Sequence, residues 1–276
     1  MAQVDTTYGT YLSNLFNPQV VADLINTKLT DNIVFAPLAR IERTLEGRPG
    51  NTVTMPYYSY ISAASSVSEG YDIPIRRLTQ TTTSVTVSKL GVAVQLTDEA
   101  VISGFGDPVG EAGDQIVTAI ADALDINLLS VLAAVSASER VYTGASTGLV
   151  ADDIPLALAK FGEDMDGEKA LLVTPDFYAK LLGSNWIPAS EIAANVKIRG
   201  SVGMAYGCQV IVSNRLTTAG NMYIVKPGTL AIFMKRGVMI ETDRDILNQS
   251  TVLAGSLICA NYLLNPSGMV KLEVGT

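Results

Sequence analysis

Two glycine-rich stretches have the composition of loops that hold a phosphate group. GSVGMAYG places Gly200, Gly203 and Gly207 directly before the β-forming run CQVIVS, whereas GFGDPVG (residues 104–110) precedes a long helical pattern. A P-loop ends in Gly-Lys-Ser/Thr before a helix, and a dinucleotide-binding loop has the spacing G-x-G-x-x-G. The first stretch lacks the lysine and leads into a strand, and in the second the third glycine comes one position late. We therefore interpret both stretches as backbone turns.

Two acidic stretches could bind calcium or form an acid–base pair. EDMDGEK places Asp164 and Asp166 before a glycine, but an EF-hand loop needs a further ligand before that glycine and a glutamate at a fixed distance after it. The stretch is more typical of a solvated turn between a helix and a strand. Asp243 and Asp245 flank Arg244, and we expect ion pairs at a contact between subunits instead of an acid–base pair.

The composition of the 276-residue chain narrows the possible chemistry. Histidine is absent, which removes the commonest general base and the commonest metal ligand. The net charge of −8 argues against a face that binds duplex DNA directly. Cys208 and Cys259 are too few for a disulfide framework, and we expect both thiols to be buried and reduced. Trp186 and the eleven tyrosines show no base-stacking pattern. Since none of these stretches matches a functional motif, we predict no catalytic, cofactor-binding or metal-binding residue.

Neither a signal peptide nor a membrane span is predicted. The N-terminal stretch MAQVDTTYGTYLSNLF has no basic region followed by an apolar core. The most apolar long stretch, residues 116–135, contains Asp122, Asp125 and Asn127. The sequence therefore predicts a soluble, cytoplasmic protein.

The first 97 residues predict an arm followed by a long β-loop. Asn17 and Pro18 are typical of a helix start, and the apolar stripe after them predicts one short helix. Residues 47–97 contain two strand-like runs, NTVTMPYYSY and TTTSVTVSKLGVAVQLT, around a turn-rich segment. In the second run the apolar residues change from odd to even positions, and we expect the necessary kink at Gly91. A two-stranded ribbon of this length is marginal alone in water, so it must lie on its own domain or on a neighbouring subunit.

A long helix and a mixed C-terminal half follow the loop. Asp107 as N-cap and Pro108 in the first turn begin a helix that we predict to continue to about residue 136, with apolar residues at i, i+3, i+4 and i+7. Short elements then alternate. They are a helix capped near Asp153, the buried strand ALLV, the helix DFYAKLL, and the strands CQVIVS, MYIV, TLAIFMK, VMIET, TVLAGSLICANYLL and MVKLEV. This order predicts the α+β class.

The order of these parts resembles that of the major capsid proteins of tailed bacteriophages, whose shell-forming fold also occurs in encapsulins. The motifs that carry the resemblance are NPQVVADLINTKL, IVFAPLARIE, GNTVTMPYYSY, LTDEAVISGFGDP, LLVTPDFYAKLL, YGCQVIVSN, the predicted strand pair YIVKPGTLAI, and ETDRDIL. Together these motifs cover nearly the whole chain. Within the family, the chain is most similar to the short capsid proteins without a fused scaffolding segment. The resemblance implies an α+β phage major capsid protein fold with an N-terminal arm, an extended β-loop, a long spine helix and a mixed α+β apical domain.

The resemblance also implies how the chain divides. The expected parts are residues 1–46 (N-terminal arm and first peripheral strand), 47–97 (extended β-loop), 98–150 (spine helix and peripheral domain), 151–250 (mainly apical domain) and 251–276 (return strands to the peripheral and apical core).

By the same resemblance the protein is structural, has no enzymatic activity and needs no cofactor. Its subunits would form hexamers and pentamers that close into an icosahedral shell around double-stranded DNA, which is held without sequence-specific contacts. The extended loop would lie over the adjacent subunit, the apical domain would surround the capsomer axes, and the arm would reach across a neighbour. Portal, scaffold or decoration proteins are possible partners, and no membrane is involved. The protein would reside in the virion, and in the host cytoplasm during assembly.

One feature of some family members is not expected here. They cross-link a lysine of the extended loop to an asparagine of a neighbouring subunit, but this chain has no lysine between Lys28 and Lys89. We therefore predict shells without a covalent mesh. Two other functions stay open from the sequence: an encapsulin-type shell around a cargo enzyme, and an enzyme that uses lysine or carboxylates.

Overall fold

The computed structural model describes Phe35 and residues 38–47, 49–58, 60–104, 106–183, 203–216 and 220–275. The predicted arm helix, Trp186 and Gly200 lie outside this part of the chain. Its helices are α3 (Asp98–Ser103), α4 (Pro108–Ala133), α5 (Asp153–Leu158) and α6 (Pro175–Gly183). Its strands are β1 (Ala39–Glu42), β2 (Thr52–Tyr58), β3 (Gln80–Thr86), β4 (Ser88–Thr97), β5 (Val141–Thr143), β6 (Lys169–Val173), β7 (Met204–Ala205), β8 (Cys208–Val212), β9 (Met222–Val225), β10 (Leu230–Asp245), β11 (Ser250–Leu263) and β12 (Met269–Glu273).

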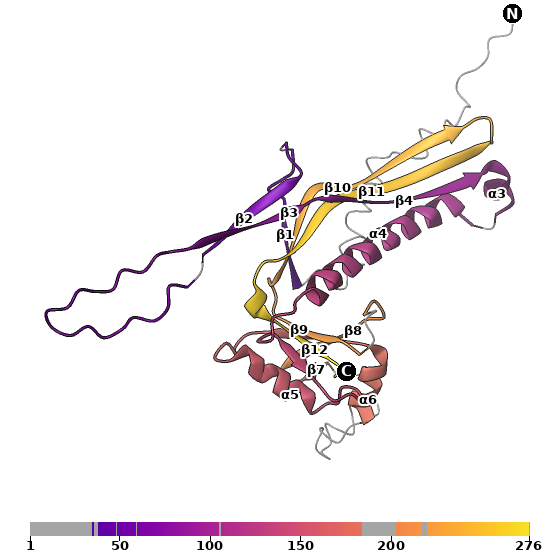
Figure 1. The fold of residues 1–276 in the computed structure, drawn as a ribbon. Coiled ribbons are helices and arrows are strands. Elements are labelled where there is room, and N and C mark those ends of the chain that lie inside the picture. Colours follow the sequence, from indigo (N-terminus) through magenta and orange to yellow (C-terminus); the bar gives the residue numbers. More distant parts are fainter. Residues whose placement is uncertain are drawn as a thin grey trace, which may run out of the picture.

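The described residues form two sheets that pack against helices, and a separate two-stranded ribbon (Figure 1). The spine sheet has the order β1-β10-β11-β4 and lies along the long helix α4. The apical sheet has the order β5-β12-β9-β6-β8-β7 and packs α5 and α6 against one face. Its other face contributes Ala170, Leu172 and Tyr223 to the core around α4. The described part contains helices together with parallel and antiparallel strand pairs, which agrees with the predicted α+β class.

The start of α4 forms as its sequence predicts. Asp107 Oδ1 accepts hydrogen bonds from the backbone N–H groups of Val109 (3.2 Å) and Gly110 (3.1 Å), and Pro108 occupies the first turn. The helix ends at Ala133, slightly before the predicted end. Its 26 residues span about 39 Å at a rise of 1.5 Å each.

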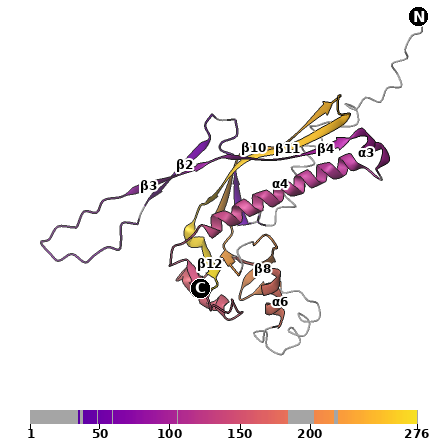
Figure 2. The same ribbon diagram turned by 45° about the vertical axis from the view of Figure 1, so that its right-hand side comes forward.

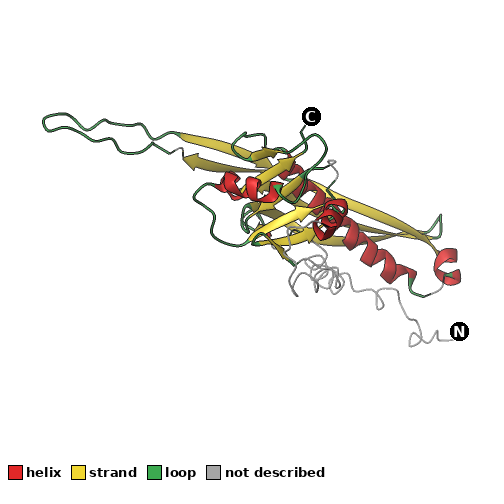
Figure 3. Ribbon diagram, turned by 90° about the horizontal axis from the view of Figure 1, so that it is seen from below, coloured by secondary structure: helices red, strands yellow, loops and turns green. Residues whose placement is uncertain are grey.

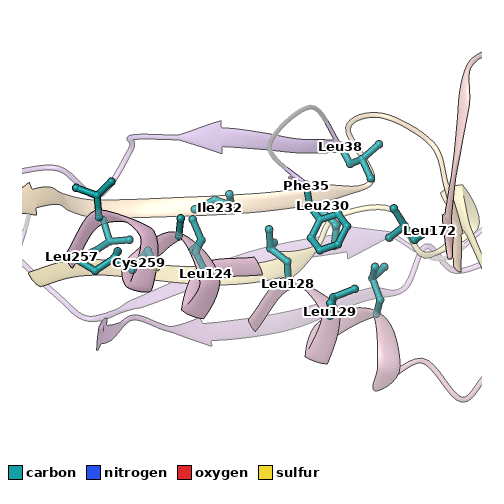
Figure 4. Packing of buried hydrophobic residues seen from close by; sticks show 14 of the residues in the cluster. Phe35, Leu38, Leu124, Leu128, Leu129, Leu172, Leu230, Ile232, Leu257 and Cys259 are labelled. Atoms are coloured by element: carbon teal, nitrogen blue, oxygen red, sulfur yellow. The ribbon is translucent and has the colours of Figure 1, made fainter. Parts of the chain in front are cut away.

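The core lies between α4 and the spine sheet (Figure 4). Leu124 and Leu128 of α4 are buried in the same cluster as Leu257 of β11. Gly255 of β11 allows the helix to approach closely, because a Cβ atom there would overlap the side chain of Ile116. By length and composition α4 could also cross a membrane, but half of its most apolar stretch is buried inside the protein. That burial is typical of a core helix.

The ribbon consists of β2 and β3, which pair antiparallel from Thr52↔Thr86 to Tyr58↔Gln80. Residues 60–79 continue beyond the paired strands without forming helix or strand (Figure 2). Both views show the ribbon pointing away from the rest of the molecule.

The second predicted strand of the loop is in fact two strands that separate at Val87. β3 stays in the ribbon, whereas β4 joins the spine sheet beside β11. The inward positions change phase between Val87 and Leu90, and Gly91 keeps a regular register opposite Ser256. The kink predicted at Gly91 is therefore wrong. Because β4 belongs to the spine sheet, the ribbon ends at residue 86 instead of residue 97.

The strands of the last third differ from the prediction in two ways. TLAIFMK and VMIET are one strand, β10, which shifts register between Met234 and Arg236 and again between Arg236 and Met239. The strands of YIVKPGTLAI do not pair, because β9 lies in the apical sheet and β10 in the spine sheet. The helix near Asp153 is predicted to continue through LALAKFGED, but α5 ends at Leu158 and is followed by a 3-10 turn.

The chain crosses between the two sheets after α4, after β9 and after β11, and the last two crossings are adjacent. Of these two, one follows β9 at residues 226–229, and the other follows β11 at residues 264–268. Lys226 N donates to Gly268 O (2.9 Å), and Leu264 N donates to Thr229 O (2.9 Å). The spine and apical parts are therefore joined by two hydrogen-bonded segments that lie side by side.

Candidate assembly surfaces

The tip of the ribbon exposes an unusual amount of apolar surface. Residues 60–79 are all exposed and lie far from the cores of the molecule (Figure 3). Arg76 Nη1 donates to Ile61 O (3.2 Å), which ties the two limbs of the tip together. A contiguous set of exposed apolar side chains is a mark of an interaction site. The exposed large apolar residues of the ribbon are Tyr58, Tyr60, Ile61, Val67, Tyr71, Ile73, Ile75 and Leu78.

The base of the ribbon, in contrast, is attached to the spine sheet. Lys235 Nζ of β10 donates to Gly50 O (2.6 Å) and to Asn51 Oδ1 (2.7 Å). Phe233 of β10 is buried in a small cluster against which Val53 and Val85 of the ribbon pack. The ribbon therefore has a fixed base and a tip without a core.

The far end of the spine sheet also exposes apolar residues. Arg244 of β10 binds Asp98 at the start of α3 through two ion-pair contacts of 2.6 Å each. The hydrogen bond from Arg244 lowers the pKa of Asp98 below its usual value. Ile102, Ile246 and Leu247 project from α3 and from the neighbouring β10–β11 turn, and Leu247 is 94% exposed. This distal patch lies at the opposite end of the molecule from the ribbon tip (Figure 1).

The ion pair that Arg244 forms at this place lies within one chain. Arg244 pairs with Asp98, and its backbone N–H donates to Asp243 Oδ1 (2.8 Å). Asp245 Oδ1 accepts from the backbone N–H groups of Leu247 (3.0 Å) and Asn248 (3.2 Å), so it holds the turn. The partner of Arg244 was not predicted, because Asp98 is distant in sequence and no local pattern indicates it; pairing of Asp243 and Asp245 between subunits stays a prediction.

A buried carboxylate links the spine helix to the apical domain. Asp125 of α4 is fully buried, and its Oδ2 binds Arg215 Nη1 at 2.8 Å. Arg215 also binds Asp122 one turn earlier, and the backbone N–H of Phe35 donates to Asp125 Oδ1 (3.4 Å). A buried charge needs such a partner because desolvation is costly. In the sequence, this site is indicated by two aspartates at i, i+3 spacing on an apolar helix. The spacing does not identify Arg215 as their partner.

The glycine stretches adopt turns. Tyr206 (φ 51°) and Gly207 (φ 77°) form the two-residue turn of the β7–β8 hairpin, and two positive φ angles are what a type I′ turn requires. Gly203 O accepts from Val210 N (3.2 Å) within the same hairpin. Gly106 (φ 89°) belongs to the entry turn of α4.

The acidic turn at residues 163–169 is held by a lysine. Lys226 Nζ binds Asp164 Oδ1 at 2.6 Å and also donates to the backbone oxygens of Asp164 (2.8 Å) and Asp166 (2.9 Å). The hydrogen bond from Lys226 lowers the pKa of Asp164. Within the described residues no cluster of three or more acidic or cysteine side chains could hold a metal ion.

Both cysteines are buried and free, as predicted. Cys208 lies in the apical core and Cys259 in the spine core. Burial raises the pKa of both thiols, that of Cys259 to about 11. A neutral, buried thiol is inert, so neither cysteine suggests catalysis.

An elongated α+β subunit with a projecting ribbon, a spine helix and a compact apical sheet has the architecture of a shell-forming coat protein. Residues 80–272 match the family model of the phage capsid protein. The chain is also 30% identical over 270 residues to the major capsid protein of Staphylococcus phage phiMR11, covering 97% of this chain and 96% of that protein. The chain therefore belongs to the phage capsid protein family, whose members are structural components of virions.

Solved structures share the fold. The capsid structure of the cyanophage P-SCSP1u has a TM-score of 0.68 at 16% identity and covers 88% of each chain. A structure from Mycobacterium phage Che8 has a TM-score of 0.67 at 19% identity and covers 86% of this chain and 90% of that chain. These similarities confirm the predicted phage major capsid protein fold.

Proposed function

We propose that this major capsid protein assembles as hexamers and pentamers into an icosahedral shell that encloses double-stranded DNA. The observation that carries the proposal is the exposure of the ribbon tip. Lys235 fixes the base of the ribbon, whereas the apolar side chains of the tip at residues 60–79 pack against no core of the described residues. A second subunit would bury this apolar surface. Because the tip and the rest of the subunit are different surfaces, the contact is heterologous, and contacts of this kind close into rings when the rotation between subunits divides a full turn evenly.

The parts of the subunit would have separate roles in this shell. The ribbon would lie over the adjacent subunit, and the apical domain, built mainly from residues 151–250, would surround the capsomer axes. The acidic chain, with a net charge of −8, suits a shell that packages DNA without binding it tightly. Portal, scaffold or decoration proteins would be further partners, and the protein would reside in the virion, and in the host cytoplasm during assembly.

Light scattering on the purified full-length chain tests the proposal most directly. We expect particles of megadalton mass, and a monomer or dimer at every concentration would contradict it. Cryo-microscopy of the particles would then show whether rings of six and five subunits are present. Copurification with nuclease-protected DNA supports a viral shell, whereas copurification with a cargo enzyme would support a cellular compartment instead.

We also infer that the shell has no covalent mesh and no catalytic role. The ribbon carries no lysine, since none lies between Lys28 and Lys89. Denaturing electrophoresis of assembled particles should therefore give one band near 29.2 kDa. A ladder of multiples would contradict this inference.

A further inference from the structure

The contact between α4 and the apical sheet is close-packed on one side and open on the other. Leu172 of β6 and Tyr223 of β9 are buried in the same core cluster as Leu129 of α4. Beside this core the described residues leave a cleft with a volume of about 230 Å³, which we call the joint cleft. Protein interiors rarely contain voids larger than a water molecule, so the two parts are not packed together here. One wall includes Ile126, Ser130 and Ala133 of α4, and the other includes Arg215, Leu216 and Asn221 of the apical part.

Arg215 connects the two walls of the joint cleft. Its Nη1 binds Asp125 Oδ2 at 2.8 Å, and its Nη2 binds Asp122 one turn earlier on α4. Asp125 is fully buried and the side chain of Arg215 is 22% exposed, so salt screens this contact only weakly. No other ion pair between described residues joins α4 to the apical part.

The backbone of Arg215 is itself attached to the apical sheet. The N–H of Ser213, at the end of β8, donates to Val173 O of β6 (3.0 Å). The N–H of Arg215 donates to Ser213 Oγ (3.2 Å). A guanidinium is a planar and rigid fork, so two carboxylates one turn apart on a helix fix both its position and its direction. The orientation of α4 is therefore passed to β6 and β8 through a series of fixed contacts.

These contacts hold the joint cleft open. Apolar atoms that border a void lose dispersion contacts, so the walls of the cleft would gain contacts if they approached each other. The guanidinium opposes that approach, because it would lose its geometry with the two aspartates. The close-packed core at Leu172 and Tyr223 would be the pivot of such a movement.

We propose that Arg215 is a positioning residue, which holds the apical part at a fixed angle to α4 and thereby sets the curvature of the assembled shell. The link to curvature rests on the proposed function. Every subunit of a shell repeats the same angle, so a small change in the angle adds up around the wall and changes its radius. Subunits without the fork would adopt a range of angles and would form shells of several sizes.

Removal of both charged partners tests the role of Arg215 in the unassembled subunit. The variant Asp125→Asn/Arg215→Met keeps the formal net charge and leaves no buried charge unpaired. The new amide oxygen can still accept from the backbone N–H of Phe35. Spin labels on the exposed positions Thr118→Cys in α4 and Glu163→Cys in the apical part report the angle as a distance, since both native cysteines are buried. We expect one narrow distance in the original chain, and a distribution shifted by several ångströms and broadened in the double variant.

Two further variants separate positioning from other effects. Lys271→Met/Glu273→Gln removes an ion pair of 3.0 Å within β12 and also keeps the net charge, so the label distance should stay the same. Ser130→Leu adds a larger side chain at the joint cleft, and in the double variant it should restore the narrow distance by filling the cleft. Circular dichroism checks that each variant is folded. If the double variant is unfolded, Arg215→Lys takes its place, because an ammonium group cannot reproduce the fork.

The diameters of assembled shells, measured by cryo-microscopy, test the link to curvature. We expect one diameter for the original chain and for the β12 control, and several diameters for the double variant. An unchanged label distance in the double variant, an equal change in the control, or no restoration by Ser130→Leu would overturn the role of Arg215. A changed label distance with one unchanged diameter would overturn the link to curvature. If the original chain forms no shells, the proposed function fails, and the label distance still decides the role of Arg215.

Discussion

The ribbon and the spine differ in what their side chains do for the subunit. In the spine, Leu124 and Leu128 are buried against β11 and stabilise the folded chain. In the ribbon, Ile73 and Ile75 are exposed and belong to no core formed by the described residues. Apolar residues of the same kind therefore serve folding in one region and, in our proposal, association in the other. The comparison predicts that mutations in the two regions change different measured quantities.

The largest expected effect is the loss of assembly when the ribbon tip is removed. Deletion of residues 60–75 leaves residues 59 and 76–79 to connect the paired Tyr58 and Gln80, and five residues are enough for a hairpin loop. The subunit should therefore stay soluble and keep its unfolding midpoint, while shell formation fails in light scattering. If the deletion variant assembles normally, the ribbon has no role in association.

A matched pair of truncations sharpens the comparison at single residues. Leu124→Ala leaves a cavity in the spine core and should lower the free energy of unfolding by about 2–5 kcal/mol. Ile75→Ala removes a similar amount of apolar surface from a fully exposed position, so the free energy of unfolding should hardly change while assembly weakens. Urea denaturation and light scattering measure the two effects. Equal loss of stability in both variants would contradict the distinction.

Thiol labelling should give a smaller but clear difference between the regions. The pKa of Cys259 is raised to about 11 by burial, so at pH 8 its thiolate is about 100-fold scarcer than that of an ordinary thiol. Cys259 should react with iodoacetamide only after denaturation. A cysteine placed in the ribbon tip by Ser66→Cys should react at once in the unassembled subunit. Rapid labelling of Cys259 in the native chain would show that the spine core opens.

The smallest expected effect concerns the ion pair at the distal patch. Arg244 lowers the pKa of Asp98 below 3.8, so the pair stabilises the fold above that pH and loses its contribution as the pH falls through the lowered value. The melting temperatures of the original chain and of Asp98→Asn should therefore differ slightly at pH 7 and converge below about pH 4. Glu99→Gln, which changes the adjacent carboxylate and keeps the pair of Asp98 and Arg244, is the control.

The parts of the fold that depend on neighbouring residues were predictable from the sequence. The cap at Asp107, the proline after it and the apolar spacing predict α4, because helix formation is decided within a few turns. The change of apolar phase in the second loop strand was also visible. The change was predicted at Gly91 because glycine is common where a strand bends. Leu90, however, already belongs to the later phase, in which the even-numbered residues point inward.

The parts that depend on distant residues were not predictable in the same way. β9 and β10 look like a hairpin because a Pro-Gly turn joins them, yet β9 pairs with the distant β12, and β10 lies between β11 and the distant β1. Arg215 and Asp125 are 90 residues apart in the sequence, and no local sequence pattern indicates that they form an ion pair. The ribbon is an intermediate case: its alternation predicts strands, and its lack of a core predicts that it needs a partner.

The two adjacent crossings between the sheets have a mechanical consequence. Since residues 226–229 and 264–268 are hydrogen-bonded side by side, these two segments act together, beside the connection from α4 to β5, when a force pulls the apical part from the spine. The bonds from Lys226 to Gly268 and from Leu264 to Thr229 hold these segments to one another, so neither can be stretched without straining its neighbour. Such a joint should resist separation of the apical part from the spine better than a single linker does.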